Sequence, residues 1–457
     1  MPSKSRTALL AGALVLPLAS IAEEAATMPE SVRAEHARPE FAQKMRWFKD
    51  AKFGIFIHYG IYSVKGIGES WSFFNGDISY PDYMKQLEGF TAAKYDPDAW
   101  AKLFAESGAR YAVMTSRHHD GVALWASGQG INVAKNSPAQ RDLVGPYVDA
   151  LRKQHLKVGL YYSILDWSHP DYDVHTRTQK RYDAKQDGAR LQRFVKYYQG
   201  QLKELSERYN PDLFWFDGDW EHSAEELGAS ETRKQLLSTN PNVIVNSRLG
   251  GYGDYATPEQ GLPVNKPMDA YWELCLTMNQ SWGYQPLDKT YKTANELIGI
   301  LARTISMGGN LLLDIGPRAD GTIDPPQVDI LKKMGRWTRK HAQAIYGTEA
   351  GIPTNYFAGP STLSPDRKTL YLFLEGRPNE KVLVLGLQND VLRATVVGNG
   401  AEVAHRVVGR HEWAKYPGML YLKVPDSALD KDITVLALEL DKPVSLYTGA
   451  PKPIETN

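Results

Sequence analysis

Residues 213–218 have the sequence Leu-Phe-Trp-Phe-Asp-Gly, an apolar run that ends on a carboxylate and a glycine. A run without polar alternation is typical of a strand buried on both faces of a parallel sheet. The preceding stretch, Gly188–Tyr209, carries apolar side chains at helical spacing, which predicts a helix with one buried face. The two segments together predict a helix followed by a strand, the repeating unit of α/β folds.

The same alternation extends from about residue 45 to residue 348. Strands are predicted at Phe53–His58, Tyr111–Ser116, Val158–Ser163, Leu213–Asp217, Val243–Asn246, Ala270–Leu276 and Asn310–Ile315. Helices are predicted at Pro97–Ser107, Pro146–Gln154, Gly188–Tyr209, Ala224–Ser238, Thr293–Met307 and Pro326–Tyr346. We expect an α/β fold of the (β/α)8 barrel type, with one strand missing or irregular. An open doubly wound sheet is the alternative, but no glycine-rich phosphate turn follows an early strand.

The pattern changes after about residue 350, where short apolar runs are separated by Gly, Asn, Asp and Pro. These runs are Tyr371–Leu374, Lys381–Leu387, Leu392–Val397, Glu402–Val408, Met419–Val424 and Ile433–Leu440. Short strands with turn residues between them predict a β-sandwich. We therefore expect a barrel over residues 29–348 and a C-terminal β-sandwich over residues 352–450.

The first 22 residues have the pattern of a signal peptide. Lys4 and Arg6 precede a short apolar run, and the small residues Ser20 and Ala22 offer a cleavage site. We expect export to the periplasm or the medium and no membrane association after cleavage; an uncleaved anchor is the alternative.

The single cysteine, Cys275, excludes an internal disulfide. The number of Lys and Arg residues (53) equals the number of Asp and Glu residues (53), so there is no excess of positive charge that would predict a nucleic-acid partner. Nothing in the sequence predicts an oligomeric state.

Polar residues collect where the predicted strands end, the rim at which barrel enzymes carry their chemistry. Asp217 is the candidate nucleophile, because a carboxylate at a fixed strand end can attack an anomeric carbon. Two other acids are candidates for a second carboxyl role, Glu259 in a loop and Glu273 in or near a strand. Arg248 offers a fixed cation for an oxygen-rich ligand.

Three histidines also lie at predicted strand ends: His58, and the adjacent pair His118 and His119, followed by Asp120. They indicate either hydrogen bonding to a polar ligand or a metal site. Adjacent side chains of an extended chain point in opposite directions, which argues against one ion held by both histidines. We expect no metal, and keep a metal-dependent hydrolase as the alternative.

The chain resembles the α-L-fucosidases of glycoside hydrolase family 29. The resemblance rests on collinear motifs across most of the barrel: Phe53-Gly54-Ile55-Phe56-Ile57-His58, His118-His119-Asp120-Gly121, Leu160-Tyr161-Tyr162-Ser163, Trp215-Phe216-Asp217-Gly218, Thr257-Pro258-Glu259, Trp272-Glu273, Ser281-Trp282-Gly283-Tyr284 and Gly309-Asn310-Leu311-Leu312-Leu313. It implies a barrel followed by a β-sandwich, retention of anomeric configuration, and neither a metal nor a cofactor.

The resemblance also implies a role for each matching residue. Asp217 matches the family nucleophile, and Glu259 is the expected acid/base, with Glu273 as the alternative. The residues expected to line the fucose pocket or pack around it are His58, His118, His119, Tyr162, Trp215, Arg248 and Trp282. We therefore expect an exo-acting retaining α-L-fucosidase that acts on fucosylated oligosaccharides or glycoconjugates. A non-catalytic sugar-binding protein on the same scaffold is the other alternative.

One stretch departs from the family pattern. Many members have Glu-Trp after the first strand, where the two residues contact sugar hydroxyls. Here the stretch is Gly68-Glu69-Ser70-Trp71-Ser72, so that Glu69 is displaced by one position. The displacement removes the family's basis for placing Glu69 in the pocket.

Overall fold

A computed structural model describes residues 28–410 and 416–449, so the leader-like residues 1–22 lie outside the described range. Parallel strands in its N-terminal part form the wall of a barrel, in the order β7-β6-β3-β2-β1-β9-β8. They are β1 (Phe53–Ile57), β2 (Tyr111–Arg117), β3 (Lys157–Ser163), β6 (Leu213–Asp217), β7 (Ile244–Val245), β8 (Glu273–Thr277) and β9 (Asn310–Ile315).

An irregular extended stretch, residues 254–260, closes the ring between β7 and β8, and we call it the bridging segment. It pairs with the β7 side through Asn246 and Tyr255, and with the β8 side through Ala256 and Trp272 and through Glu259 and Cys275. These are isolated parallel bridges and not a continuous ladder. The eighth strand expected to be missing or irregular is therefore irregular.

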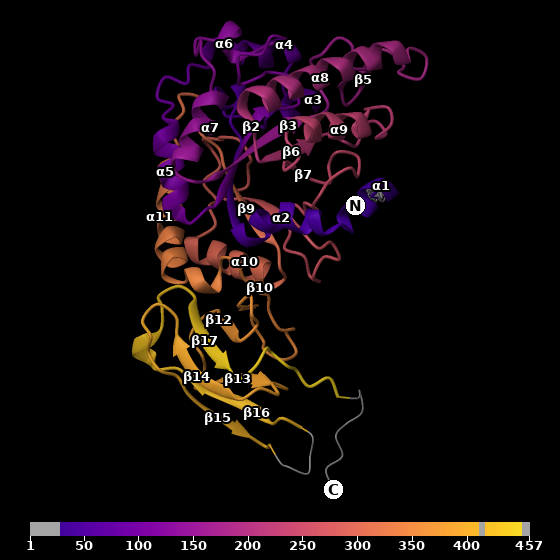
Figure 1. Cartoon of the computed structure of the whole chain (residues 1–457). Coiled ribbons are helices and arrows are strands. Elements are labelled where there is room, and N and C mark those ends of the chain that lie inside the picture. Colours follow the sequence, from indigo (N-terminus) through magenta and orange to yellow (C-terminus); the bar gives the residue numbers. More distant parts are fainter. Residues whose placement is uncertain (1–27, 411–415, 450–457) are drawn as a thin grey trace, which may run out of the picture.

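Helices follow most of the strands and cover the outside of the barrel (Figure 1). They are α5 (Pro97–Ser107), α7 (Val144–Lys153), α8 (Gly188–Tyr209), α9 (Ala229–Thr239), α10 (Ala294–Ser306) and α11 (Pro325–Lys340). Local chemistry sets their ends: the Asp96 side chain accepts from the Ala99 amide at the start of α5, and left-handed Gly108 ends this helix. Within the described residues, no helix follows β7 or the bridging segment before the next strand.

The other elements lie in the N-terminal region, in the loops and in the C-terminal part. They are α1 (Glu30–His36), α2 (Pro39–Ala51), α3 (Trp71–Phe74), α4 (Tyr80–Met84), α6 (Val133–Asn136), the 3-10 turns Ile61–Ser63, Lys85–Gly89, Ala342–Ala344 and Asp426–Ala428, and the hairpin of β4 (Val174–Thr176) and β5 (Gln179–Lys180). Across the described ranges, none of the helices combines the length and the apolar character needed to cross a membrane.

The interior of the barrel is packed, and α2 contributes to it. Phe41, Met45 and Phe48 of α2 form one buried cluster with side chains from the barrel wall. Those wall residues are Phe56, Tyr111, Val113, Tyr161, Leu213, Trp215, Ile244, Tyr255, Cys275 and Leu312. Alternate residues of the same strands, such as Phe214 and Phe216, instead pack in a second cluster with the outer helices. This two-sided burial explains why the strands have uninterrupted apolar sequences.

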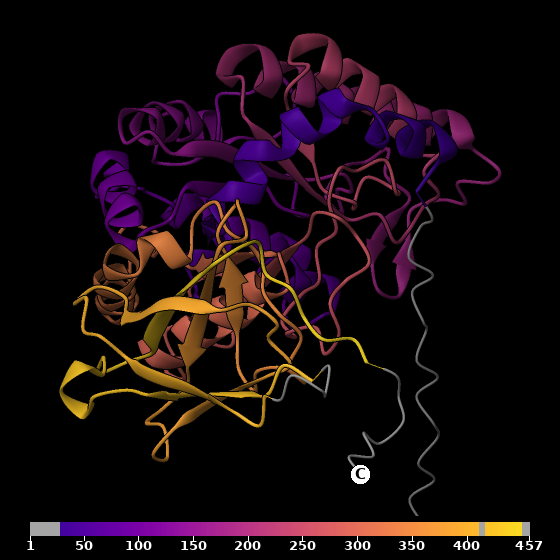
Figure 2. The same cartoon turned by 60° about the horizontal axis from the view of Figure 1, so that its bottom comes forward.

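The C-terminal strands form two antiparallel sheets around a core of their own. One sheet has the order β10-β11-β12-β17-β14 and the other β13-β16-β15. Their bounds are β10 (Glu349–Ala350), β11 (Ser361–Leu363), β12 (Thr369–Leu374), β13 (Val382–Leu385), β14 (Val391–Val396), β15 (Ala404–Val408), β16 (Met419–Lys423) and β17 (Thr434–Leu440). Figure 2 shows this lobe, in orange and yellow, beside the barrel.

Residues of α11 join the two lobes. The Trp337 indole N–H donates to the Ile433 carbonyl at 2.7 Å, and Lys340 lies 2.7 Å from Asp430. The expected fold class is confirmed: a (β/α)8-type barrel is followed by a β-sandwich. Strand bounds differ from the prediction by at most three residues in the barrel. Elements that were not predicted are α1, α2, α3, α4, α6, β4, β5, β10 and β11.

Candidate active site

A pocket opens at the carboxyl ends of the barrel strands. It is lined by Phe56, His58, Glu69, Trp71, His118, Tyr161, Trp215, Asp217, Trp220, Arg248, Glu259 and Trp282. Its volume of about 110 Å³ corresponds to on the order of ten water-sized spheres, comparable with the number of heavy atoms in one monosaccharide. The pocket therefore suits a single ring.

Asp217 is the last residue of β6, and its carboxylate is 13% exposed. The Tyr161 hydroxyl donates to its Oδ2 at 2.9 Å, and Arg248 Nη1 donates to its Oδ1 at 3.0 Å. The chain then turns sharply, because Gly218 has φ of 97° and a Cβ there would lie 2.7 Å from Leu165. The glycine after the strand thus lets the backbone leave while the carboxylate stays in the pocket.

Arg248 connects the two candidate catalytic carboxylates. Its Nη1 contacts Asp217, and its Nη2 donates to Glu259 Oε2 at 2.7 Å. Three other contacts fix the guanidinium: Nε donates to Thr257 Oγ1 at 3.1 Å, Nη2 donates to the Thr257 carbonyl at 3.3 Å, and the group stacks 4.7 Å over the Trp215 ring. Glu259 is 39% exposed, so it lies toward the mouth while Asp217 lies deeper.

His118 and His119 approach the same cavity, contrary to the expected opposite directions. Their ring centroids are 4.2 Å apart; His118 lines the pocket, and His119 Nε2 lies 3.6 Å from Asp217 Oδ2. The expectation was wrong because β2 ends at Arg117 and the histidines lie in the following turn, where strand alternation no longer applies. His118 Nδ1 contacts the Ser70 hydroxyl.

His58 follows β1 and lies against Asp314 of β9, with Nδ1 2.7 Å from Oδ1. Burial, with His118 nearby, lowers the pKa of His58, and burial beside Glu69 raises the pKa of Asp314. Both shifts favour the uncharged forms of the two side chains. Burial also lowers the pKa of His118 and that of His119, so these imidazoles are neutral hydrogen-bonding groups.

Glu69 lines the pocket despite its displaced position in the sequence. The side chain accepts a hydrogen bond from the Gly283 amide at 2.6 Å, and the residue is only 5% exposed. Burial raises the pKa of Glu69 to about 7. The displacement left the place of Glu69 open, and the structure puts it in the pocket, since the residue lies in a loop where a shift by one position does not reverse the side chain.

Tyr162 does not reach the pocket, which corrects its predicted role. Its hydroxyl donates to Gln201 Oε1 at 2.8 Å, and the Arg117 guanidinium lies 4.4 Å over its ring, on the side of the outer helices. The pocket receives Tyr161 instead. Strand alternation explains the difference, because Tyr161 is in register with Trp215, which points into the barrel.

Glu273, the alternative acid/base, is the first residue of β8 and is completely buried. It accepts hydrogen bonds from the Tyr111 hydroxyl and, at 2.9 Å, from the Trp215 indole N–H. Burial raises the pKa of Glu273 to about 7. The carboxyl lies behind Trp215 and not among the lining residues, so it has no direct access to a bound ligand.

Aromatic rings form much of the pocket wall. Trp215 and Trp282 lie there as expected, and the Trp282 ring centroid is 5.0 Å from that of His58. Sequence reasoning missed Trp71 and Trp220, which also line the pocket and whose rings stack with centroids 5.8 Å apart. Among the described residues, no group of three or more His, Cys, Asp or Glu has a metal-binding arrangement. The Asp120 carboxylate, for example, is held by Tyr83 and the Val122 amide.

Comparison with known proteins gives consistent matches. The profile of the family described as Alpha-L-fucosidase matches residues 19–343. Tissue α-L-fucosidase from Rattus norvegicus is 34% identical over 368 residues, covering 74% of this chain and 77% of that protein. Plasma α-L-fucosidase from Homo sapiens is 33% identical over 384 residues, covering 77% and 80%.

Solved structures of α-L-fucosidases are also similar to this chain. α-L-Fucosidase isoenzyme 1 from Paenibacillus thiaminolyticus has a TM-score of 0.79 and 35% identity, covering 88% of this chain and all of that one. A family 29 α-L-fucosidase from Bacteroides thetaiotaomicron, in a trapped covalent intermediate with 2-fluoro-fucosyl fluoride, has a TM-score of 0.77 and 28% identity, covering 87% and 96%.

Proposed function

The chain belongs to the α-L-fucosidase family of glycoside hydrolases, and we propose that it is an exo-acting enzyme that releases L-fucose from fucosylated glycans with retention of configuration. The observation that carries the proposal is the shared contact of Arg248 with Asp217 and Glu259. Two carboxyl groups that line one pocket and contact the same guanidinium fit the pair of acids that glycoside hydrolases use. A pocket that fits one ring favours removal of a terminal sugar.

In the first step, an Asp217 oxygen attacks C1 of fucose and the bond from C1 to the aglycone oxygen breaks. Glu259 gives its proton to that leaving oxygen, and a fucosyl ester on Asp217 remains. Arg248 and Tyr161 hold the two Asp217 oxygens in place, so the nucleophile is oriented before the sugar arrives. The greater exposure of Glu259 fits its role at the mouth, where the aglycone leaves.

In the second step, the Glu259 carboxylate takes a proton from water, and the water oxygen attacks C1. The ester bond breaks, which releases L-fucose and restores the Asp217 carboxylate. The trapped covalent intermediate of the Bacteroides relative supports this two-step course.

The remaining lining residues are proposed to bind the sugar. Neutral His58 and His118 and the buried Glu69 offer hydrogen bonds to hydroxyl groups without adding a full positive charge. Trp282 offers an apolar wall for the methyl group that distinguishes fucose from hexoses with CH2OH.

The test is hydrolysis of an aryl α-L-fucoside followed by NMR during the first turnovers. Release of α-L-fucose before mutarotation supports the proposal. A lack of hydrolysis with measurable fucose binding would favour a sugar-binding protein instead. Loss of activity with a chelator, restored by zinc, would favour the metal-dependent alternative.

We also propose that the chain is exported, because residues 1–22 have the pattern of a leader peptide. Expression in a bacterium followed by mass spectrometry of the periplasmic protein tests this. A mature N-terminus directly after Ala22 is expected, and a full-length membrane-bound product contradicts it.

A further inference from the structure

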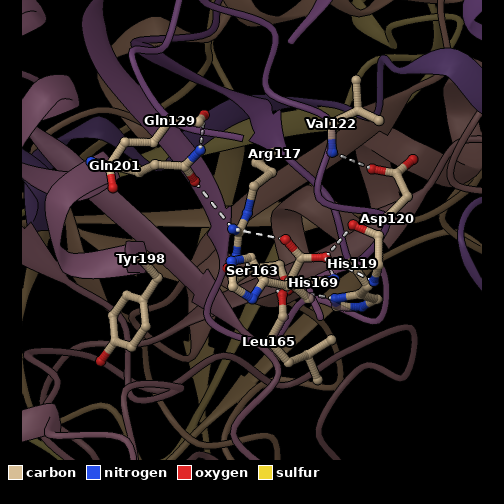
Figure 3. A network of polar contacts seen from close by, with 12 residues as sticks. Arg117, His119, Asp120, Val122, Gln129, Ser163, Leu165, His169, Tyr198 and Gln201 are labelled. Carbon is tan, nitrogen blue, oxygen red and sulfur yellow. Dashed lines mark hydrogen bonds and ion pairs between the residues drawn. The ribbon is translucent and has the colours of Figure 1, made fainter. Parts of the chain in front are cut away.

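A chain of polar contacts connects Gln201 with Arg117, Arg117 with Ser163, and Ser163 with His119 (Figure 3). His119 is 1% exposed, and its Nδ1 lies 2.7 Å from the Ser163 hydroxyl oxygen. Its other nitrogen, Nε2, is buried without a hydrogen-bond partner and lies 3.6 Å from Asp217 Oδ2. One imidazole thus connects Ser163 with the carboxylate proposed to attack the sugar.

Arg117 lies behind this histidine and is completely buried. Its Nη2 donates to the carbonyl of Ser163 at 2.6 Å and to that of Leu165 at 3.1 Å. Its Nη1 lies 3.3 Å from Asp166 Oδ2 and 3.1 Å from Gln201 Oε1. The Leu165 carbonyl therefore has a donor in Arg117 and does not depend on the Ser163 hydroxyl, which lies 2.8 Å away.

The single hydroxyl proton of Ser163 has two acceptors within reach, the Leu165 carbonyl and His119 Nδ1. If the proton goes to Leu165, Nδ1 must carry the imidazole proton, and the Nε2 lone pair is then buried facing a carboxylate without any donor. If the proton goes to Nδ1, Nε2 carries the imidazole proton and points it toward Asp217. Only the second arrangement leaves no buried lone pair without a donor.

Electrostatics favours the same arrangement. The imidazole lies between the Arg117 cation on its Nδ1 side and the Asp217 carboxylate on its Nε2 side. A neutral imidazole in that field has lower energy when its N–H faces the carboxylate and its lone pair faces the cation. Burial, together with the charge of Arg117, lowers the pKa of His119, so the ring stays neutral and its tautomer matters.

We propose that Ser163 is a positioning residue that holds His119 in the Nε2–H tautomer, so that His119 presents a fixed donor beside Asp217. Resting on the proposed function, this donor meets the hydroxyl next to the anomeric carbon, since Asp217 attacks that carbon. Hydrogen bonds to this hydroxyl strengthen in the transition state of glycosidases. A histidine with the opposite tautomer would offer a lone pair there and repel the nucleophile.

The direct test is NMR of the wild-type protein labelled with ¹⁵N-histidine, with couplings between ring nitrogens and carbon-bound protons identifying the tautomer. The His119 signals are those that disappear in His119→Gln. We expect a protonated Nε2 and an unprotonated Nδ1 at neutral pH. A protonated Nδ1 with an unprotonated Nε2, or a doubly protonated ring, overturns the proposal. This measurement needs no turnover, so it stands apart from the question of fucosidase activity.

The kinetic test compares Ser163→Ala with Ser116→Ala. Ser116 is an equally buried strand serine whose hydroxyl donates to the Tyr161 carbonyl, so its loss disturbs the sheet without touching an imidazole. By analogy with partners that orient metal-bound histidines, we expect Ser163→Ala to lower kcat/KM by about 10- to 100-fold and to mix the His119 tautomers. Ser116→Ala should retain the wild-type tautomer and lose less than about 10-fold in kcat/KM, because it orients no imidazole. Equal losses in both variants, or an unchanged tautomer in Ser163→Ala, contradict the role of Ser163.

Discussion

Nη2 of Arg248 lies 2.7 Å from Oε2 of Glu259 at the mouth of the pocket. The proposed reaction needs a proton on Glu259 when the aglycone leaves, whereas this contact stabilises the carboxylate. Binding of a glycoside at the mouth is therefore expected to separate the pair, while the contact of Arg248 with Asp217 persists. After the ester forms, the same arginine can hold the Glu259 carboxylate that activates water.

Replacing Arg248 with lysine tests the shared contact. A single ammonium cannot reproduce the planar fork that reaches both carboxylates. Each hydrogen bond to a charged group contributes about 1.5–3 kcal/mol, so we expect Arg248→Lys to lower kcat/KM by about 10- to 100-fold. Steady-state kinetics on an aryl fucoside measures the effect. Activity near the wild-type level would mean that Arg248 has no orienting role.

Asp217→Gly removes the proposed nucleophile from the end of β6. We expect kcat to fall by about 10⁴-fold or more, as for other covalent catalysts without their nucleophile, with the fold retained. Azide should then enter the vacated space and give fucosyl azide of inverted configuration. Asp212→Asn is the control, since Asp212 pairs with Lys157 at the opposite end of the strand. Full activity in Asp217→Gly would end the assignment.

Glu259→Gln tests whether Glu259 protonates the leaving group, separately from the attack of Asp217 on C1. We expect a decrease of about 10²- to 10⁴-fold on fucosides with poor leaving groups, and a much smaller decrease in ester formation from activated aryl fucosides. Azide should give fucosyl azide of retained configuration, because it attacks the ester on Asp217. Glu273→Gln should keep the wild-type dependence on leaving group, and the reverse pattern would move the acid/base role to Glu273.

Glu273 should make stability depend on pH. Its pKa is raised from 4.5 to about 7 by burial, so the folded protein keeps a proton that the unfolded chain loses. The stabilisation from this group is complete below pH 4.5 and is lost as the pH rises toward 7. Glu273→Gln cannot ionise, so its free energy of unfolding should decline less over this range, by on the order of 3 kcal/mol. Urea unfolding at several pH values measures this, and parallel curves for both proteins contradict it.

The regular elements could be predicted because their signals are local. β6 with its terminal Asp217 follows from an apolar run and a glycine, and α5 from a capping aspartate, a proline and a final glycine. The bridging segment has no such signal. Its polar residues and Pro258 have no strand periodicity, and long-range hydrogen bonds to the neighbouring strands hold it in place.

The site was predictable in its strand-end residues and less so in its loops. Strand alternation favours Tyr161 over Tyr162 once the register is known. Ser163 lies opposite Asp217, so the residue two positions earlier, Tyr161, faces the same side as Asp217. The position of Glu69 could not be predicted from the sequence, because the Gly283 amide that holds its side chain is 214 residues away in the chain.

The two proposed catalytic residues lie on backbone segments that differ in regularity. Asp217 ends a strand that forms a ladder with β3, whereas Glu259 lies on the bridging segment, which has isolated bridges and is followed by no helix before β8 in the described part of the chain. Insertions or exchanges in residues 261–271, the loop that follows the bridging segment, should therefore be tolerated by the barrel while they change the surface beside the mouth of the pocket. This loop is the natural place for evolution, or for a protein engineer, to change linkage preference and leave bond cleavage intact.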